Sequence, residues 1–214
     1  MKIIIGNKNY SSWSLRGWLM LSRTGVEFDE ELIQLDIDGF KDRILSHSTA
    51  GQVPILKHDG QTIWDSLAIG EYLAETSPQS QLWPTDRTVR ARARAVSAEM
   101  HSGFAALRTH MPMDMRNNYP GEGRGEGVEA DIARIIEIWS ECLANAGTEG
   151  PFLFGTFTIA DAMYAPVVSR FRTYGIALPD DCQAYADAVW NWPDMQAWVA
   201  AAEAEPWIIE TLKT

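Results

Sequence analysis

Cysteine and histidine are scarce in this sequence of 214 residues, which has two cysteines and four histidines. Cys142 and Cys182 form no Cys-x-x-Cys pair and lie in stretches of helical character, so we expect buried free thiols. The histidines show no close metal-ligand spacing with one another or with cysteine. We therefore predict no metal. The four histidines are His47, His58, His101 and His110.

Basic charge is also low, and the formal net charge at pH 7 is -11. This acidic balance argues against nucleic acid and against anionic membrane surfaces as partners. No apolar run approaches the ~20 residues of a membrane span, and the run in residues 1–6 is too short for a signal peptide. We expect a cytoplasmic protein. Its 46% of hydrophobic residues can fill the core of one large or two small domains.

Residues 53–69 predict a strand, a turn, a second strand and a helix. Asp59-Gly60 favours a two-residue hairpin turn between residues 53–58 and 61–64, because both central positions of that turn need positive φ. Pro54 lacks the N–H that a strand ladder uses, so it indicates a sheet edge, a bulge or a cis bond. Ser66 is a good N-cap for a helix over residues 67–75.

This stretch has the chemistry to bind both charges of a free amino-acid end. The helix N-terminus at Ser66 favours an α-carboxylate, and the Asp65 carboxylate favours a cation. Val53, beside Pro54, can pair its backbone with an extended ligand, which together suits a γ-glutamyl peptide. The alternative is a purely structural role, because edge prolines and Asp-Ser caps are common features that usually bind nothing.

The order of predicted elements indicates two domains. Strands over residues 2–6 and 26–35 and helices over 13–23 and 39–45 precede the hairpin, which gives the βαβαββα order of a thioredoxin-like domain over residues 1–78. Residues 79–85 form a linker, and residues 86–214 read as an all-helical domain. Within it, residues 87–115 predict one or two long helices, and Thr158 and Asp161 form a capping box before another helix.

Ser11-Ser12-Trp13-Ser14 lies where thioredoxin-like redox proteins have Cys-x-x-Cys. Because the first cysteine in the chain is Cys142, dithiol chemistry from this loop is excluded. On local sequence alone, the two serines are an N-cap and its neighbour.

The assembled pattern strongly resembles the glutathione transferase family. In that family a Val-Pro with a cis bond precedes a strand, an acidic residue followed by Ser opens the next helix, and a Ser/Thr-x-Ala-Asp box opens a central helix of the C-terminal domain. Residues 10–16 are similar to the Ser-Ser-Cys-x-x-Arg loop of the zeta class, the maleylacetoacetate isomerases, and to serine loops of theta-like classes. Trp13 replaces the zeta cysteine, which predicts an altered acceptor pocket.

The resemblance implies a glutathione transferase that uses glutathione as co-substrate and an electrophilic small molecule as acceptor, in a homodimer that serves detoxification. It also implies a role for each matching residue: thiolate stabilisation by Ser11 with Ser12 as second choice, peptide binding by Gln52 and Val53, γ-glutamyl binding by Asp65 and Ser66, and an acceptor site at Trp13, Met111 and Met113. Two alternatives stay open. One is a glutathione-dependent cis-trans isomerase of the maleylacetoacetate type, and the other is a non-catalytic module that binds a protein partner.

Overall fold

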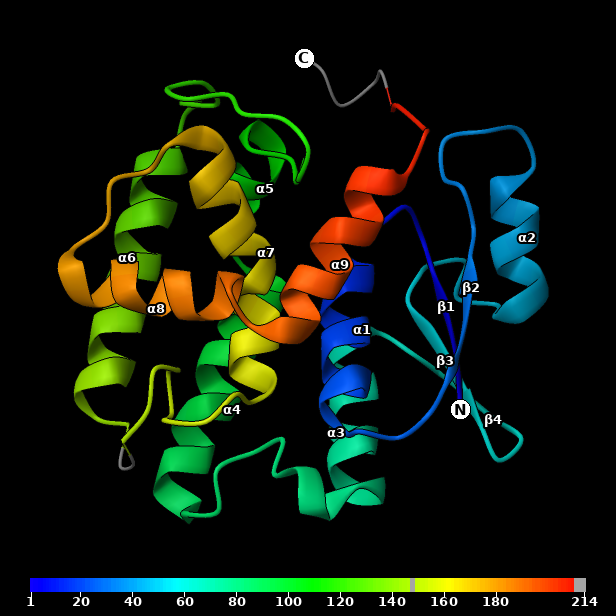
Figure 1. The fold of residues 1–214 in the computed structure, drawn as a ribbon, viewed down its shortest axis with the longest axis horizontal. Helices are drawn as coiled ribbons and strands as arrows, with labels where there is room; N and C mark the ends of the chain where they lie inside the picture. The colour runs from blue at the N-terminus through cyan, green and yellow to red at the C-terminus, as the bar shows by residue number, and fades with distance from the viewer. Residues whose placement is uncertain (147–148, 210–214) are drawn as a thin grey trace.

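The computed structural model describes residues 1–146 and 149–209, in which an α/β half is followed by an all-helical half (Figure 1). The elements of the first half follow one another in the predicted βαβαββα order. They are β1 (Lys2–Ile5), α1 (Ser12–Arg23), β2 (Asp29–Leu32), α2 (Phe40–His47), β3 (Ile55–His58), β4 (Gln61–Trp64) and α3 (Ser66–Thr76).

The sheet has the strand order β2-β1-β3-β4. β1 and β2 are parallel, whereas β1 pairs antiparallel with β3 and β3 antiparallel with β4. Asp59 and Gly60 have φ values of 47° and 76°, so both turn residues adopt the left-handed region that a two-residue hairpin turn of this kind needs. The predicted hairpin is confirmed.

The two faces of the sheet pack against different helices. Because side chains alternate along a strand, Ile3 and Ile5 join the core that includes α1 and α3, while Ile4 joins a smaller cluster with Ile44 of α2. In Figure 1, α2 accordingly lies on the opposite side of the sheet from α1 and α3. The predicted thioredoxin-like arrangement is confirmed.

The second half is helical and is built around α7, whose residues are buried along nearly its whole length. This helix packs on α1, α4 and α8. In the order of the chain, the described elements of this half are a short 3-10 turn (Pro78–Ser80), α4 (Arg87–Ser102), α5 (Ala105–His110), α6 (Val128–Ala144), α7 (Ile159–Tyr174), α8 (Asp180–Trp190) and α9 (Pro193–Ala204).

The predicted long helices over residues 87–115 are only partly correct. α4 ends at Ser102, and Phe104 then adopts a left-handed φ of 60° that breaks the helical path. The following α5 has six residues and ends at His110. Pro112 has no backbone N–H and disfavours helical geometry at the residue before it, so the methionine-rich segment that follows is not helical.

The capping box at the start of α7 is confirmed. The Asp161 carboxylate accepts from the backbone N–H of Thr158 at 2.7 Å and from its hydroxyl at 3.0 Å. Its other oxygen accepts from the N–H of Leu153 at 3.1 Å. Asp161 is fully buried, and burial raises the pKa of its carboxyl to about 6 although these hydrogen bonds act in the opposite direction.

Helix α1 is held between the sheet and the helical half. Arg16 of α1 donates from Nε to the carbonyl of Met163 in α7 at 3.0 Å. A Cβ on Gly17 would lie only 2.9 Å from Cγ of Pro54, so α1 can approach the Pro54 loop this closely only because residue 17 is glycine.

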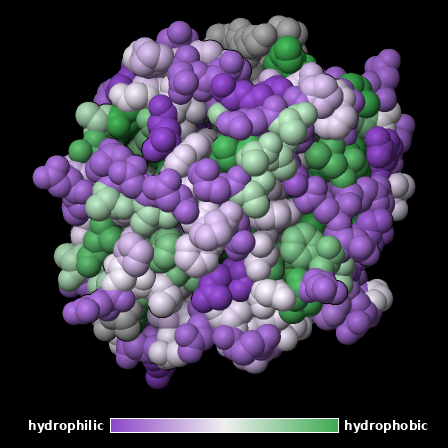
Figure 2. Space-filling model, viewed as in Figure 1, coloured by the Kyte–Doolittle hydropathy of each residue, from purple (hydrophilic) through white to green (hydrophobic). Residues whose placement is uncertain are grey.

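On the molecular surface, hydrophilic residues are spread over the face shown in Figure 2, and hydrophobic residues form separate groups.

Candidate functional site

The N-terminus of α1 is capped by a serine, as the sequence suggested. Ser11 is the N-cap, and its Oγ accepts from the N–H of Ser14 at 3.4 Å. The Ser11 hydroxyl also lies 2.7 Å from Oγ of Ser14, which itself accepts from the N–H of Gly6 at 2.9 Å. Ser14 is fully buried. It therefore links the Ser11 hydroxyl to the end of β1, a role that sequence reasoning missed.

Ser12 is the first residue of α1 and Trp13 the second. Ser11 and Ser12 are each 8% exposed. Since the peptide dipoles of a helix add along its axis, the start of α1 places a positive dipole end beside both hydroxyls. This is an environment that stabilises a thiolate.

The residues before β3 lie beside this helix start. The peptide bond between Val53 and Pro54 is cis. Gln52 is exposed and Val53 half-buried. Together with Ser11 and Ser12, both line one cavity.

The start of α3 corrects one prediction. Its N-cap is Asp65 rather than Ser66, since Oδ1 of Asp65 accepts from the N–H groups of Leu67 at 2.8 Å and Ala68 at 3.3 Å. Both residue types are good caps, and here the carboxylate fits because Asp65 adopts a φ of 71°, which aspartate tolerates better than most residues. Ser66 is instead the first helical residue.

Ser66 is 1% exposed, and its Oγ has no hydrogen-bond partner among the residues that the structure describes. A buried hydroxyl without a partner is costly, and such groups in folded proteins usually have a bound water or ligand. Ser66 lines the same cavity as Ser11. An acceptor or donor on a ligand at the N-terminus of α3 would therefore fit it.

This cavity has a volume of about 760 Å³ and lies where the α/β half meets α4. It brings together seven of the nine predicted site residues, which are Ser11, Ser12, Trp13, Gln52, Val53, Asp65 and Ser66. Met111 and Met113 are placed elsewhere. They are 0% and 1% exposed and pack in the main hydrophobic core.

His101, near the end of α4, also lines the cavity, and sequence reasoning did not assign it to the site. Its Nε2 lies 2.6 Å from Oδ2 of Asp65, and its ring packs edge-on against Trp13 with 5.3 Å between centroids. No local motif marks this histidine, because it reaches Asp65 from a helix 36 residues further along the chain.

Trp13 contacts two arginines. The guanidinium carbons of Arg16 and Arg108 are 4.4 Å and 4.8 Å from its ring centroid, within cation–π range. Arg16 is fully buried, and burial, reinforced by the charges of Arg108 and Arg170, lowers its pKa well below the ordinary value. Burial likewise lowers the pKa of Arg170 to about 10. The indole is thus fixed in a region of positive charge.

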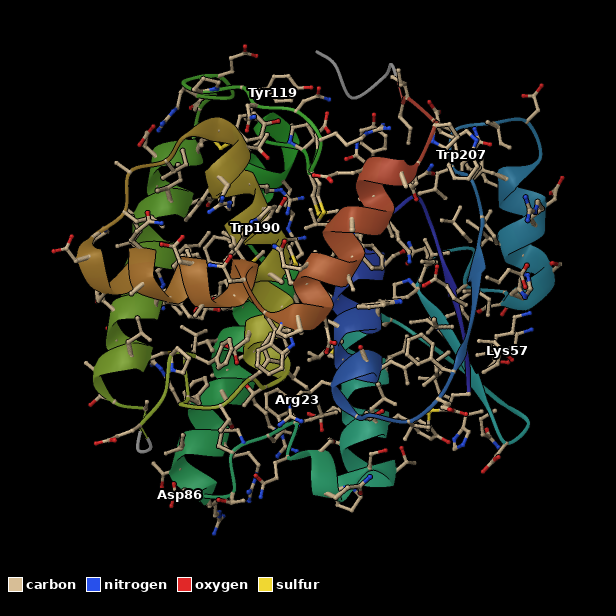
Figure 3. The ribbon with its side chains drawn as sticks, in the orientation of Figure 1. Arg23, Lys57, Asp86, Tyr119, Trp190 and Trp207 are labelled. Carbon is tan, nitrogen blue, oxygen red and sulfur yellow. The ribbon has the colours of Figure 1, made fainter. Side chains whose placement is uncertain are left out.

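A second cavity, of about 980 Å³, shares Tyr10 with the first. Arg116 lines it and donates to the Tyr10 hydroxyl at 3.1 Å and to the carbonyls of Glu205 and Trp207, both at 2.5 Å. Figure 3 shows Tyr119, which also lines the cavity, and Trp207 at the same end of the molecule. Burial, with the neighbouring Asp114 carboxylate, raises the pKa of Tyr119 to about 12, so its hydroxyl is a neutral donor.

Within residues 1–146 and 149–209, no group of three or more histidine, cysteine, aspartate or glutamate side chains is arranged to hold a metal ion. In the same part of the chain, no helix is both long enough and apolar enough to span a membrane.

A four-stranded thioredoxin-like domain joined to a helical domain, with a serine-lined cavity at their junction, defines the glutathione transferase class of fold. The chain matches the family model for the glutathione S-transferase N-terminal domain over residues 10–76 and that for the C-terminal domain over residues 90–201. It belongs to the glutathione S-transferase family.

Within this family, the chain is similar in sequence to maleylacetoacetate isomerases. A maleylacetoacetate isomerase of Rattus norvegicus is 39% identical over 171 residues, covering 78% of this chain and 76% of that protein. A probable maleylacetoacetate isomerase of Caenorhabditis elegans is 35% identical over 168 residues, covering 78% and 77%. This chain is therefore similar to zeta-class proteins, as the loop at residues 10–16 suggested.

Solved structures agree on the fold. A glutathione transferase homologue from Burkholderia with bound glutathione has a TM-score of 0.74 at 24% identity and covers 95% of this chain and 98% of its own. A bacterial maleyl pyruvate isomerase of the zeta class has a TM-score of 0.72 at 24% identity, covering 96% and 99%. The predicted family and two-part fold class are confirmed.

Proposed function

We propose that this protein is a glutathione transferase that binds reduced glutathione in the 760 Å³ cavity. The observation that carries the proposal is the meeting of three features in that cavity: the serine hydroxyls at the start of α1, the Val53–Pro54 segment, and the start of α3 with the unpartnered Ser66 Oγ. A tripeptide with a thiol in its middle and an amino-acid group at one end fits that order of features.

Each end of the ligand would meet a matching group. Val53 and Gln52 would bind the peptide backbone. At the γ-glutamyl end, Asp65 would receive the ammonium group, while the Ser66 hydroxyl, at the positive end of the α3 dipole, would donate to the carboxylate. These contacts would place the cysteinyl sulfur near Ser11.

Glutathione supplies the thiol that attacks the electrophile, and the protein's part is to favour its ionised form. A free thiol has a pKa near ~8.5, and lowering it by about two units corresponds to roughly 2.7 kcal/mol of differential stabilisation. Ser11 would supply part of this by donating its hydroxyl hydrogen to the sulfur. The buried Ser14 can then turn its own hydroxyl to donate to Ser11 Oγ, so the hydrogen bonds continue to Gly6.

The electrophile would enter from the second cavity, which shares the lining residue Tyr10 with the first. Trp13, in cation–π contact with Arg16 and Arg108, would form the boundary on the glutathione side. Met111 and Met113 would support this region from the core rather than touch the acceptor. We further propose a cytoplasmic homodimer that serves detoxification, as in the family at large.

A second candidate is a glutathione-dependent cis-trans isomerase. The observation that favours it is the 35% and 39% identity to proteins named as maleylacetoacetate isomerases. In that reaction the thiolate adds to one carbon of a double bond and leaves again after rotation, so glutathione is recovered.

The two activities differ in stoichiometry. We expect purified protein with reduced glutathione to consume one thiol per product when given haloaromatic or epoxide electrophiles, as measured by loss of free thiol. Conversion of a cis-enone dicarboxylate to its trans isomer with no loss of thiol would identify the isomerase instead. Well-folded protein that does neither, and that does not bind glutathione, would leave the protein-interaction module as the better account.

A further inference from the structure

His101 and Asp65 form a hydrogen-bonded pair that lines the proposed glutathione cavity, and they come from opposite halves of the molecule. Asp65 begins α3 in the α/β half, and His101 lies in the last turn of α4 in the helical half. Their side chains are 42% and 28% exposed, so a ligand in the cavity can reach both. Ser66, with its unpartnered Oγ, lines the same cavity.

The two carboxylate oxygens of Asp65 have different hydrogen-bond partners. Oδ1 caps α3 by accepting from two backbone N–H groups, and only Oδ2 faces His101. A ligand ammonium that approaches Asp65 must therefore share Oδ2 with the imidazole or take it over. In the second case the imidazole N–H would become available to donate to the carboxylate on the same ligand carbon.

We propose that His101 is a specificity-determining residue that binds the α-carboxylate of the γ-glutamyl group while Asp65 binds its ammonium; this inference rests on the proposed glutathione binding. The Asp65–His101 pair is complementary to a zwitterion, because each partner can exchange the other for an opposite group on the ligand. The edge-on contact packs the imidazole against Trp13, which lines the same cavity. His101 thereby makes the helical half part of glutathione recognition.

Calorimetric titration of two ligands tests this role. One ligand is reduced glutathione, and the other is γ-aminobutyryl-cysteinyl-glycine, which retains the amino group and lacks only the α-carboxylate. We expect the wild type to bind glutathione at least about tenfold more tightly than the analogue, and the His101→Ala variant to lose most of this preference. The main effect falls on glutathione affinity, and affinity for the analogue changes little.

His47→Ala is the matched control. It breaks a similar histidine–carboxylate pair, in which Nε2 of His47 lies 2.9 Å from Oε1 of Glu31, away from the residues that line the cavity. We expect it to keep the wild-type preference for the α-carboxylate. Thermal denaturation of both variants establishes that they are folded.

The inference is overturned if His101→Ala keeps the full preference for the carboxylate. It is also overturned if this variant binds glutathione more tightly than the wild type, since His101 would then merely compete for Asp65. A wild type that binds neither peptide contradicts the proposed function itself, whereas binding with an unchanged preference contradicts only the role of His101.

Discussion

Replacing Ser11 by alanine should raise the pKa of the bound glutathione thiol by up to about two units and lower turnover at pH 7 by up to about 25-fold, the corresponding loss of thiolate. The reason is that Ser11 is the N-cap of α1, so its hydroxyl lies where the helix dipole already favours negative charge. The thiol pKa is measured from the ultraviolet absorbance of the thiolate in the binary complex. Turnover should recover as pH rises, because the thiolate then forms without help.

Ser12→Ala is the matched control for this prediction, since Ser11 and Ser12 have the same exposure and line the same cavity. We expect a smaller effect from it. Ser14→Ala should resemble a mild form of Ser11→Ala, because it removes the group that holds the Ser11 hydroxyl. A large loss in Ser12→Ala with little change in Ser11→Ala would transfer the role to Ser12.

Replacing Asp161 by alanine should lower the free energy of unfolding by about 3 kcal/mol or more. Three donors lose their acceptor in the protein interior, namely the N–H groups of Leu153 and Thr158 and the Thr158 hydroxyl. Each buried donor left without a partner costs ~1–3 kcal/mol. For a chain of this size, 3 kcal/mol corresponds to a fall in Tm of about 6–12 °C, measured by calorimetry. Asp161→Asn, which keeps one acceptor oxygen, should lose less.

The loss of stability in Asp161→Ala should also depend on pH. Because burial raises the pKa of Asp161 to about 6 in the folded state, above the ordinary value of 3.8, the folded protein binds this proton more tightly than the unfolded chain. The stability contributed by that proton is present below pH 3.8 and is lost as pH rises through 6. The stability difference between wild type and Asp161→Ala should therefore shrink over this range. A difference that grows with pH would contradict the assignment.

The parts of the fold that sequence predicts well depend on neighbours in the chain. Asp59 and Gly60 determine the hairpin through their own φ preferences, and Thr158 and Asp161 cap α7 within one helical turn. Ser11 and Ser12 were placed correctly at the start of α1 by the same local chemistry. The predicted N-cap of α3, Ser66, is one residue later than the observed N-cap, Asp65, because both residue types are good N-caps.

The parts that sequence does not predict depend on contacts between distant segments. His101 reaches Asp65, and Arg16 reaches the carbonyl of Met163, only after the two halves have packed together. Charged side chains are rarely fully buried, so nothing in the local pattern marked Arg16 as a core residue. In the sequence, Met111 and Met113 are equally compatible with a pocket or a core, and in the structure both are buried in the main core.

The most direct test of the account is calorimetric titration of reduced glutathione into the wild type and Asp65→Asn. Asparagine keeps the N-cap and tolerates the φ of 71°, so this variant removes the charge without removing the helix start. Asp59→Asn is the control, since it removes one charge at another positive-φ aspartate, in the hairpin turn. We predict that the wild type and Asp59→Asn bind glutathione alike and that Asp65→Asn binds it at least about tenfold more weakly. Equal binding by all three, or no binding by folded wild type, would contradict the proposed site.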